Sequence, residues 1–444
     1  MSTQIKRTRL IITLLVMLFL AGGTALAIQF AKGYRPNLAQ LALNGTGLLS
    51  VTSYPKNAQV FINDRLTTVT DDTLNLSPGE YQVKIIKTGF HPWIKTVSIK
   101  PELVSSTDAR LFPSIPSLTP LTFYQVSSPL LSPDGSKLLY ILTNSPFSQD
   151  NGVYVLSLAN SIFPGNQISQ IADLSTFDYT QAALVWSPDG SQILALIHDT
   201  AKIIASHLLN PRNLNQAKNL TDTTFRLPLL LNQWQDQQKS INLTNLARFP
   251  EFIQKVASES AVNVYFSPDR EKILYTAIKD LEIPENLADK AVPSINPSPQ
   301  NRKLEAGKTY VYDLKEDSNY LISEAKYDSK TAQPLIIDGT IATPPAKEPS
   351  QLTSLLTQIN LLRGAYDPHT TQNLGWYTTN RHLIITNGEG VSLVEYDDSN
   401  PTSIIPTQVE QGLAVPSPDG THLIILSNLN QQTNVANLIS LDLK

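Results

Sequence analysis

Short stretches in which apolar and polar residues alternate recur from about residue 47 onward. Alternation with a period of two is typical of β-strands that bury one face. In the first such region the alternating stretches begin at Leu49, Val60 and Tyr81, and Ser77-Pro78-Gly79 provides a turn between strands. The pattern predicts a small β-sandwich over residues 47–112, preceded by a tether at 32–46 and followed by a linker at 113–121.

A repeated sequence motif dominates the rest of the chain. It reads Ser-Pro-Asp, then Gly or Arg, then an apolar run, and its copies begin at Ser132, Ser187, Ser267 and Ser417, with a worn copy at 376–385. Proline suits the second position of a type I turn, and Asp bonds the nearby backbone. Glycine then adopts the left-handed conformation that turns the chain into a hairpin. Each copy therefore predicts a tight turn followed by a strand.

Repeats of strand, turn and strand indicate a β-propeller, whose blades are four-stranded sheets. The predicted propeller covers residues 122–444. Five blades are recognisable, and the predicted total is five to seven. The copies are unevenly spaced, and helical patterns near 228–257 and 350–363 account for the extra length. In the second pattern leucine and isoleucine recur at helical spacing, and Gly364 is the expected stop. The predicted fold class is therefore all-β with helical insertions.

The N-terminus predicts a membrane anchor. Residues 10–31 carry no charge and as a helix would run about 33 Å, enough to cross the hydrocarbon core of a bilayer. Lys6, Arg7 and Arg9 precede this stretch, so residues 1–9 are expected to stay in the cytoplasm and the bulk to be extracytoplasmic. A signal peptide cleaved after Ala27 is the alternative, because Ala25-Leu26-Ala27 has the cleavage-site pattern. We favour the anchor because the apolar run continues past that site.

Composition narrows the possible functions. Only 16% of residues are charged and the net charge is −4, so nothing suggests a nucleic-acid partner. The chain has no cysteine, which excludes disulfides, thiolate metal sites and cysteine nucleophiles.

Residues 47–112 resemble a PEGA domain. The match covers Pro55–Ala58, Ile62-Asn63, Leu76–Tyr81 and Gly89-Phe90 with Trp93. The tetrapeptide that names the family is Pro-Glu-Gly-Ala, and this chain has Lys56 and Asn57 in the central positions. PEGA domains occur on bacterial and archaeal surface proteins and are not known as catalysts. The resemblance therefore implies a surface module.

The Ser-Pro-Asp-Gly repeats resemble those of TolB-like propellers, a branch of the WD-repeat-like group, over about 320 residues. The order of anchor, PEGA module and propeller resembles a class of bacterial envelope proteins. This resemblance supports the fold more than the function, because propellers carry many activities.

Several groups of residues could be mistaken for chemical sites, but each is interpreted as structural. The four aspartates of the repeat are interpreted as turn residues: Asp134, Asp189, Asp269 and Asp419. The six histidines are scattered and none has metal-ligand spacing, while His382 and His422 occupy the same place after their turns. Asp71-Asp72 and Asp397-Asp398 are interpreted as solvated turns, and Gly388-Glu389-Gly390 as a hairpin turn. No G-x-S-x-G elbow of a serine hydrolase occurs.

The sequence therefore predicts a membrane-anchored, extracytoplasmic binding or scaffold protein rather than an enzyme. Its partner would be an envelope protein or a cell-wall or surface glycan, with no cofactor, no metal and no assignable catalytic residue. One alternative is a hydrolase or lyase that acts on a cell-surface polymer at the propeller channel, which would require acids, His or Arg clustered at inner positions. The other is a transmembrane sensor, for which nine cytoplasmic residues leave little to signal with.

Overall fold

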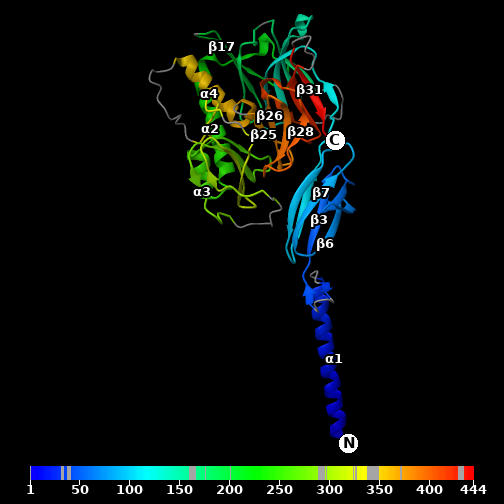
Figure 1. The fold of residues 1–444 in the computed structure, drawn as a ribbon. Helices are drawn as coiled ribbons and strands as arrows, with labels where there is room; N and C mark the ends of the chain where they lie inside the picture. The colour runs from blue at the N-terminus through cyan, green and yellow to red at the C-terminus, as the bar shows by residue number, and fades with distance from the viewer. Residues whose placement is uncertain are drawn as a thin grey trace. The chain divides into compact units, whose positions relative to one another are not determined.

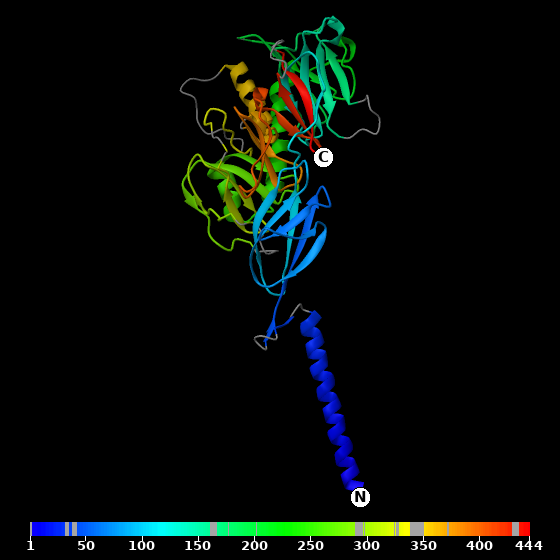
Figure 2. The ribbon, with the colours of Figure 1, turned by 45° about the vertical axis from the view of Figure 1, so that its right-hand side comes forward.

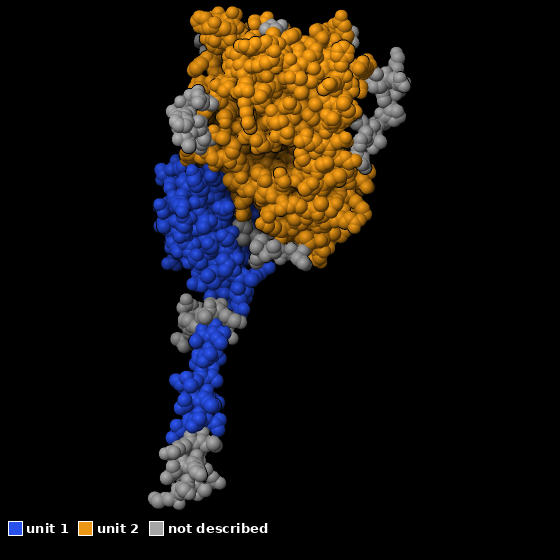
Figure 3. All heavy atoms as spheres, turned by 180° about the vertical axis from the view of Figure 1, so that it is seen from behind, with its two compact units in different colours: residues 1–111, 293–297 blue, residues 112–292, 298–444 orange. Residues whose placement is uncertain are grey.

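The 444-residue chain forms one N-terminal helix and two compact units of β-structure in the computed structural model (Figures 1 and 3). The structure describes residues 2–31, 35–37, 42–159, 167–175, 177–200, 202–288, 296, 298–323, 325, 328–337, 350–370, 373–428 and 435–444. The first unit comprises residues 1–111 with 293–297, and the second comprises residues 112–292 with 298–444.

The N-terminal helix α1 runs from Ser2 to Ala31 and contains the whole uncharged stretch. Among the described residues, no helix combines the length and the apolar character needed to span a membrane. The anchor expected at residues 10–31 therefore stays a prediction.

The first unit contains a two-sheet sandwich that matches the expected β-module. One sheet has the order β6-β3-β9 and the other β5-β4-β7-β8. β3 pairs antiparallel with β6 but parallel with β9. The strands are β3 (Gly47–Tyr54), β4 (Gln59–Ile62), β5 (Arg65–Val69), β6 (Asp72–Leu76), β7 (Gly79–Ile86), β8 (Trp93–Ile99) and β9 (Val104–Arg110). A short hairpin of β1 (Arg35–Asn37) and β2 (Ala42–Asn44) precedes them.

Period-two burial explains why this sandwich forms. In β8 every second residue from Trp93 to Ile99 is buried, and in β3 the core side chains Leu49 and Val51 are fully buried. These residues join Val60, Val83 and others from both sheets in one core. The alternation read from the sequence is thus the inward face of each sheet.

The second unit contains five separate four-stranded antiparallel sheets, which we number one to five in chain order. Sheet one has β11 (Gln125–Leu131), β12 (Lys137–Thr143), β13 (Gly152–Ser157) and β14 (Ile168–Asp173). Sheet two has β15 (Ala183–Trp186), β16 (Ile193–His198), β17 (Ile203–Leu209) and β18 (Thr221–Asp222). Sheet three has β19 (Ala261–Phe266), β20 (Lys272–Ala277), β23 (Thr309–Asp313) and β24 (Ser318–Leu321). Sheet four has β25 (Leu374–Trp376), β26 (His382–Asn387), β27 (Gly390–Glu395) and β28 (Thr402–Ile405). Sheet five has β29 (Ala414–Pro416), β30 (His422–Ser427), β31 (Asn437–Asp442) and β10 (Leu118–Pro120). A two-stranded ribbon of β21 (Leu281–Glu282) and β22 (Lys303–Leu304) extends from sheet three.

Sheet five joins the two ends of this unit. β10 comes from residues 113–121, which the sequence analysis expects to be a linker, and it pairs with β31 near the C-terminus through Leu118↔Leu441. This pairing ties the first strand of the unit to its last sheet, a common way to close a propeller. Each of the five sheets contains one of the five repeat copies counted from the sequence.

The sheets pack against one another in sequence. Buried residues of sheets one and two share one core, as do those of sheets three and four, four and five, and five and one. Both faces of most strands are therefore buried, as in β20, where all six residues are buried. A sheet with two apolar faces needs a neighbour on each side, and a ring of sheets provides one.

Helices fill the one remaining interval, between sheets two and three (Figure 2). The helices are α2 (Leu227–Leu246), α3 (Glu251–Glu259) and α4 (Gln351–Tyr366). α2 and α4 share a core with sheet two, and α3 shares one with sheet three. α4 also contacts β15 and β19, the first strands of these two sheets. The helices thus lie at the places predicted, but their role is that of a wedge that completes the ring.

The end of α4 differs from the expectation. Gly364 was the expected stop, yet the helix continues to Tyr366. Gly364 is a buried helical residue, and the chain leaves the helix at Asp367, which has extended backbone angles. The physical reason is Pro368, because a proline disfavours helical conformation in the residue before it.

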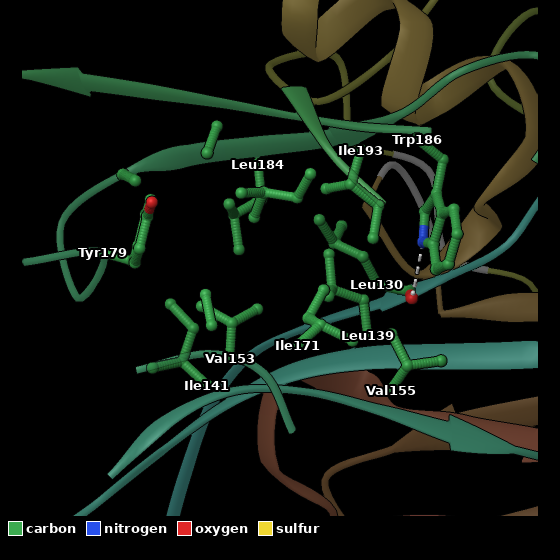
Figure 4. Packing of buried hydrophobic residues seen from close by; sticks show 14 of the residues in the cluster. Leu130, Leu139, Ile141, Val153, Val155, Ile171, Tyr179, Leu184, Trp186 and Ile193 are labelled. Carbon is green, nitrogen blue, oxygen red and sulfur yellow. Dashed lines mark hydrogen bonds between the residues drawn. The ribbon is translucent and has the colours of Figure 1, made fainter. Parts of the chain in front are cut away.

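A buried tryptophan ties neighbouring sheets together (Figure 4). Trp186, at the end of β15, is fully buried, and its indole N–H donates to the carbonyl oxygen of Leu130 in sheet one at 3.2 Å. Trp376 in sheet four makes the same bond, also 3.2 Å long, to Tyr265 in sheet three. The worn copy of the repeat is thus a structural equivalent of the second copy.

The repeated sequence motif forms the predicted turn. At its second copy the Gly190 N–H donates to Ser187 O at 2.8 Å, and the Ser187 hydroxyl donates to Asp189 Oδ1 at 2.6 Å. Gly190 has a φ of +66°, in the left-handed region. The equivalent position holds Arg270 at +59° and Asn380 at +58° in other copies. The backbone geometry is therefore a property of the turn, whichever residue occupies it.

Replacement of Gly190 by Val is expected to destabilise the second unit by about 1–2 kcal/mol, because a β-branched residue resists a left-handed φ. The measurement is the urea-unfolding midpoint or Tm of the purified protein. Arg270→Gly is the matched control, since this exposed position has the same backbone angle and should lose no stability. Equal melting of Gly190→Val and the wild type would show that the turn does not have this geometry.

Candidate functional site at the centre of the ring

Helix α4 and the residues that follow it meet the first strand, or the turn leading into it, of all five sheets. We call β11, β15, β19, β25 and β29 the inner strands; each is an edge strand of its sheet. α4 contacts β15 and β19, and the following helix η4 (Pro368–Thr370) contacts β25. Residues 367 and 369 reach β11 and the turn before β29. We call residues 359–369 the central segment.

Two side chains of the central segment donate to sheet two. The Arg363 guanidinium donates through Nε to Leu184 O, and the Tyr366 hydroxyl donates to Trp186 O at 2.9 Å. Leu184 and Trp186 are two residues apart in β15, so their carbonyl groups point to the same side of the strand. Since β15 has a strand partner only on its other side, these two carbonyls lack a ladder partner. The two side chains supply it.

Asp367 and His369 connect the segment to two further sheets. Asp367 accepts the Leu131 N–H of β11 at Oδ2 and the His369 N–H at Oδ1, both at 3.1 Å. His369 Nδ1 lies 3.0 Å from the carbonyl oxygen of Gly412, in the turn before β29. Pro368 packs close to β25, where a Cβ on Gly375 would stand 3.2 Å from its Cγ. One short segment thus holds four sheets by direct contacts.

Burial sets the electrostatics of this segment. Asp367 is 0% exposed, and burial raises the pKa of its carboxyl, although His369 and the two N–H donors oppose the rise. Burial likewise lowers the pKa of Arg363 and raises that of the Tyr366 hydroxyl. Acid, histidine and arginine therefore gather at the centre, as the channel-enzyme hypothesis required, but each is bonded to ring backbone.

A second buried polar cluster lies at the junction of sheets three and four. Glu316 accepts hydrogen bonds from the hydroxyl groups of Tyr320 and Tyr396, both at 3.2 Å. Tyr396 follows directly after β27 of sheet four. Lys272 pairs with Asp313 at 3.4 Å in the same region. Burial and the nearby carboxylates raise the pKa of Tyr396. These groups satisfy one another, which is the usual requirement for buried charge.

An open, polar hollow of about 590 Å³ lies beside β21 and β22. Its lining includes Arg302, which pairs with the buried Asp317 at 3.1 Å. The lining residues are Glu282, Glu285, Asn286, Gln300, Asn301, Arg302 and Lys303. In the described part of the chain, no group of three or more residues of metal-ligand type comes together.

The residues set aside in the sequence lie where that interpretation puts them, with one exception; Asp71 and Asp72 are exposed as expected, although Asp72 is already the first residue of β6. Asp134, Asp189, Asp269 and Asp419 each accept the hydroxyl of the Ser two positions earlier. His382 and His422 each begin the second strand of a sheet and bond through Nδ1 to a threonine hydroxyl at 2.8 Å. Gly388-Glu389 form a hairpin loop.

The exception is Asp397, expected in a solvated turn. It is 0% exposed and accepts the Ser399 hydroxyl at 2.6 Å. The turn is correct, but packing of sheets three and four covers it: the neighbouring Tyr396 lies in their shared core.

The central segment was missed as a site. The sequence pattern over α4 indicated only its leucine face. The available signal was Tyr366-Asp367-Pro368-His369, a polar run directly after an apolar helix, with a proline that ends the helix.

Comparison with known proteins confirms the PEGA resemblance read from the sequence. The family model described as "PEGA domain" matches residues 46–114, so the first unit contains a PEGA domain. No curated protein matches the chain. TolB proteins are among the solved structures found.

Three of these structures define how far the likeness extends. TolB from Acinetobacter baumannii is 12% identical with a TM-score of 0.23, covering 82% of this chain and 59% of that one. Putative TolB from Agrobacterium tumefaciens is 14% identical with a TM-score of 0.20, covering 69% and 71%. Oligogalacturonate lyase in complex with manganese is 9% identical with a TM-score of 0.19, covering 90% and 91%. This chain therefore spans about three fifths of the first structure, and scores this low carry no argument about activity.

Tyr366→Phe is expected to destabilise the second unit by about 1–2 kcal/mol, because Trp186 O at the ring centre then loses its hydroxyl donor. Urea unfolding of the purified protein measures the loss. Tyr154→Phe is the matched control: its hydroxyl donates to Asp150 O at 2.7 Å beside a surface loop, where water replaces the bond. If both variants lose the same stability, the central bond has no special role.

His207 gives the unit a pH dependence. This residue of β17 is 4% exposed and packs on Phe177 with ring centroids 4.3 Å apart. Burial lowers its pKa below the ordinary value, while Asp222 opposes the shift. The unfolded chain then binds the proton more readily, so stability falls as the pH drops from about 6.5 through the folded-state pKa. Unfolding between pH 7.5 and 5.5 should show a smaller loss in His207→Gln than in the wild type; equal losses would contradict this assignment.

Proposed function

We propose that this chain is a membrane-anchored extracytoplasmic binding or scaffold protein that recognises an envelope protein or a cell-surface glycan. The observation that carries the proposal is a PEGA domain followed by a ring whose centre is filled by the chain's own central segment. PEGA domains occur on surface proteins and are not known as catalysts. The uncharged N-terminal stretch supports attachment to a membrane.

The bonding of the central segment supports binding over catalysis. A general acid or base must reach the substrate proton within hydrogen-bond distance. Asp367 is wholly buried and its two oxygens each accept a backbone N–H. His369 is held by the Gly412 carbonyl. Catalysis by these groups would first require the central segment to leave its place.

Tethering also favours a binding role. A module held at a membrane meets partners at the same membrane at a raised effective concentration. The loops of a ring of sheets emerge on two faces, which suits large ligands. A protein or glycan of the envelope satisfies both conditions.

The proposed membrane topology, with a retained N-terminal anchor and the bulk of the chain outside the cytoplasm, can be tested in the cells that make the protein. Protease added outside the cytoplasmic membrane should digest the PEGA domain and the ring, and mass spectrometry of the mature protein should recover residues 10–31. A mature N-terminus at Ile28 would contradict the anchor and favour a released protein. Digestion only after lysis would contradict the extracytoplasmic location.

The binding role predicts saturable capture without turnover. The full chain in nanodiscs should bind an envelope protein or purified cell-surface glycan while leaving generic hydrolase and lyase substrates unchanged. Reproducible turnover that is lost in Asp367→Asn or His369→Gln, but kept in the exposed control Asp134→Asn, would overturn the proposal in favour of a channel enzyme.

A further inference from the structure

The four-stranded sheet of the PEGA domain carries apolar side chains on its outer face. Residues that pair directly across neighbouring strands project to the same face of a sheet. Phe61 of β4 pairs with Leu66 of β5 and with Lys84 of β7. Lys84 pairs in turn with Ile94 of β8. One row across all four strands therefore contains three apolar residues and one lysine.

A second row lies beside the first. Gln59 of β4 pairs with Val69 of β5 and with Ile86 of β7. The apolar members of the two rows form what we call the outer patch: Phe61, Leu66, Val69, Ile86 and Ile94. None of them belongs to the core between the two sheets, which is built from alternate residues of these strands.

The outer patch is open to solvent. Leu66 is 55% exposed, Val69 51% and Ile94 41%, while Phe61 and Ile86 are half-buried. An antiparallel sheet that packs one face on a core commonly has a polar outer face. Adjoining exposed apolar side chains instead mark a surface that meets a protein or a membrane.

The charge within the outer patch favours a membrane. Lys84 lies in the middle of its row, and in the described part of the chain it forms no ion pair. A two-fold contact between copies of this face would bring Lys84 near its own counterpart, which is unfavourable. Anionic lipid fits better, because the aliphatic stem of a lysine lies along apolar groups while its ammonium reaches a phosphate. The acid on this face, Glu80, lies two rows away, opposite Ser98.

The proposed anchor would also keep the PEGA domain close to a bilayer. Residues 32–46 separate the uncharged N-terminal stretch from β3. Even when fully extended they would span only about 50 Å, and the hairpin of β1 and β2 shortens this reach. A surface held so near meets lipid at a raised effective concentration, so a few apolar contacts are enough for binding.

We propose that the outer patch is a lipid-binding surface, through which the PEGA domain lies with its four-stranded sheet on an anionic bilayer. The apolar side chains enter the interface, and Lys84 contacts lipid phosphate. This inference rests on the proposed anchor and deepens it, because it gives the anchored domain a defined face toward the membrane.

Site-specific fluorescence in the full chain tests this surface, because the chain contains no cysteine. The variant Leu66→Cys is labelled with nitrobenzoxadiazole and reconstituted into vesicles of equal parts phosphatidylcholine and phosphatidylglycerol. The matched control is Asn75→Cys, at an exposed position of β6 in the opposite sheet. The outer faces of a sandwich point in opposite directions, so only one of the two labels can lie on the bilayer.

Nitroxide-labelled lipid should quench the label at position 66 at least threefold more than the label at position 75. Addition of Lys84→Glu to Leu66→Cys should lower this quenching at least twofold, whereas Lys202→Glu, at an exposed position of the ring, should leave it unchanged. Equal quenching at positions 66 and 75 would overturn the proposal. Shielding of position 66 from both lipid and aqueous quenchers, with cross-linking between copies through it, would overturn it in favour of a second copy.

Flotation of the same vesicles separates this inference from the proposed anchor. A full chain that floats with the vesicles, but whose label at position 66 is not quenched by lipid, keeps the anchor and overturns the lipid-binding surface. A full chain that does not float overturns both.

Discussion

The inner strands of the ring carry backbone groups that no other strand can pair, and the second unit depends on how these groups are satisfied. In β15 the carbonyls of Leu184 and Trp186 point away from β16, and in β11 the Leu131 N–H is held outside the ladder. An unpaired backbone group away from water costs about as much as a lost hydrogen bond. Arg363, Tyr366 and Asp367 remove this cost with three side chains from one helix end.

The wedge of helices follows from a second constraint, which is the two-faced burial of the sheets. Four pairs of sheets share cores: one and two, three and four, four and five, and five and one. Among the described residues, sheets two and three share none. α2 and α4 cover the open face of sheet two, and α3 covers that of sheet three. Because α4 must lie in this interval, its C-terminal end is directed to the ring centre. Packing of the wedge and occupation of the centre are therefore one structural event.

Much of this architecture could be predicted from the sequence because the signals are local. The turn around Asp189 depends on four adjacent residues, and the alternation from Trp93 to Ile99 lies within one strand. The equivalence of His382 and His422 could be read from their distance to the turn. In each case the structural feature depends only on residues that are neighbours in the sequence.

What could not be predicted depends on partners far apart in the sequence. The contacts between Arg363 and Leu184, and between Asp367 and Leu131, cross well over a hundred residues. The burial of Asp397 is also decided by another sheet. The strand β10 looks like a linker because its three residues become a strand only on pairing with β31. Composition and periodicity carry no information about such pairings.

The central claim is that the end of α4 occupies the centre of the ring. Site-specific photo-crosslinking tests it most directly: Tyr366 is replaced by p-benzoylphenylalanine in the full chain, which is irradiated and mapped by peptide mass spectrometry. The account predicts adducts with β15 and with neighbouring inner strands. Adducts confined to α2 and α4, with none on an inner strand, would contradict it.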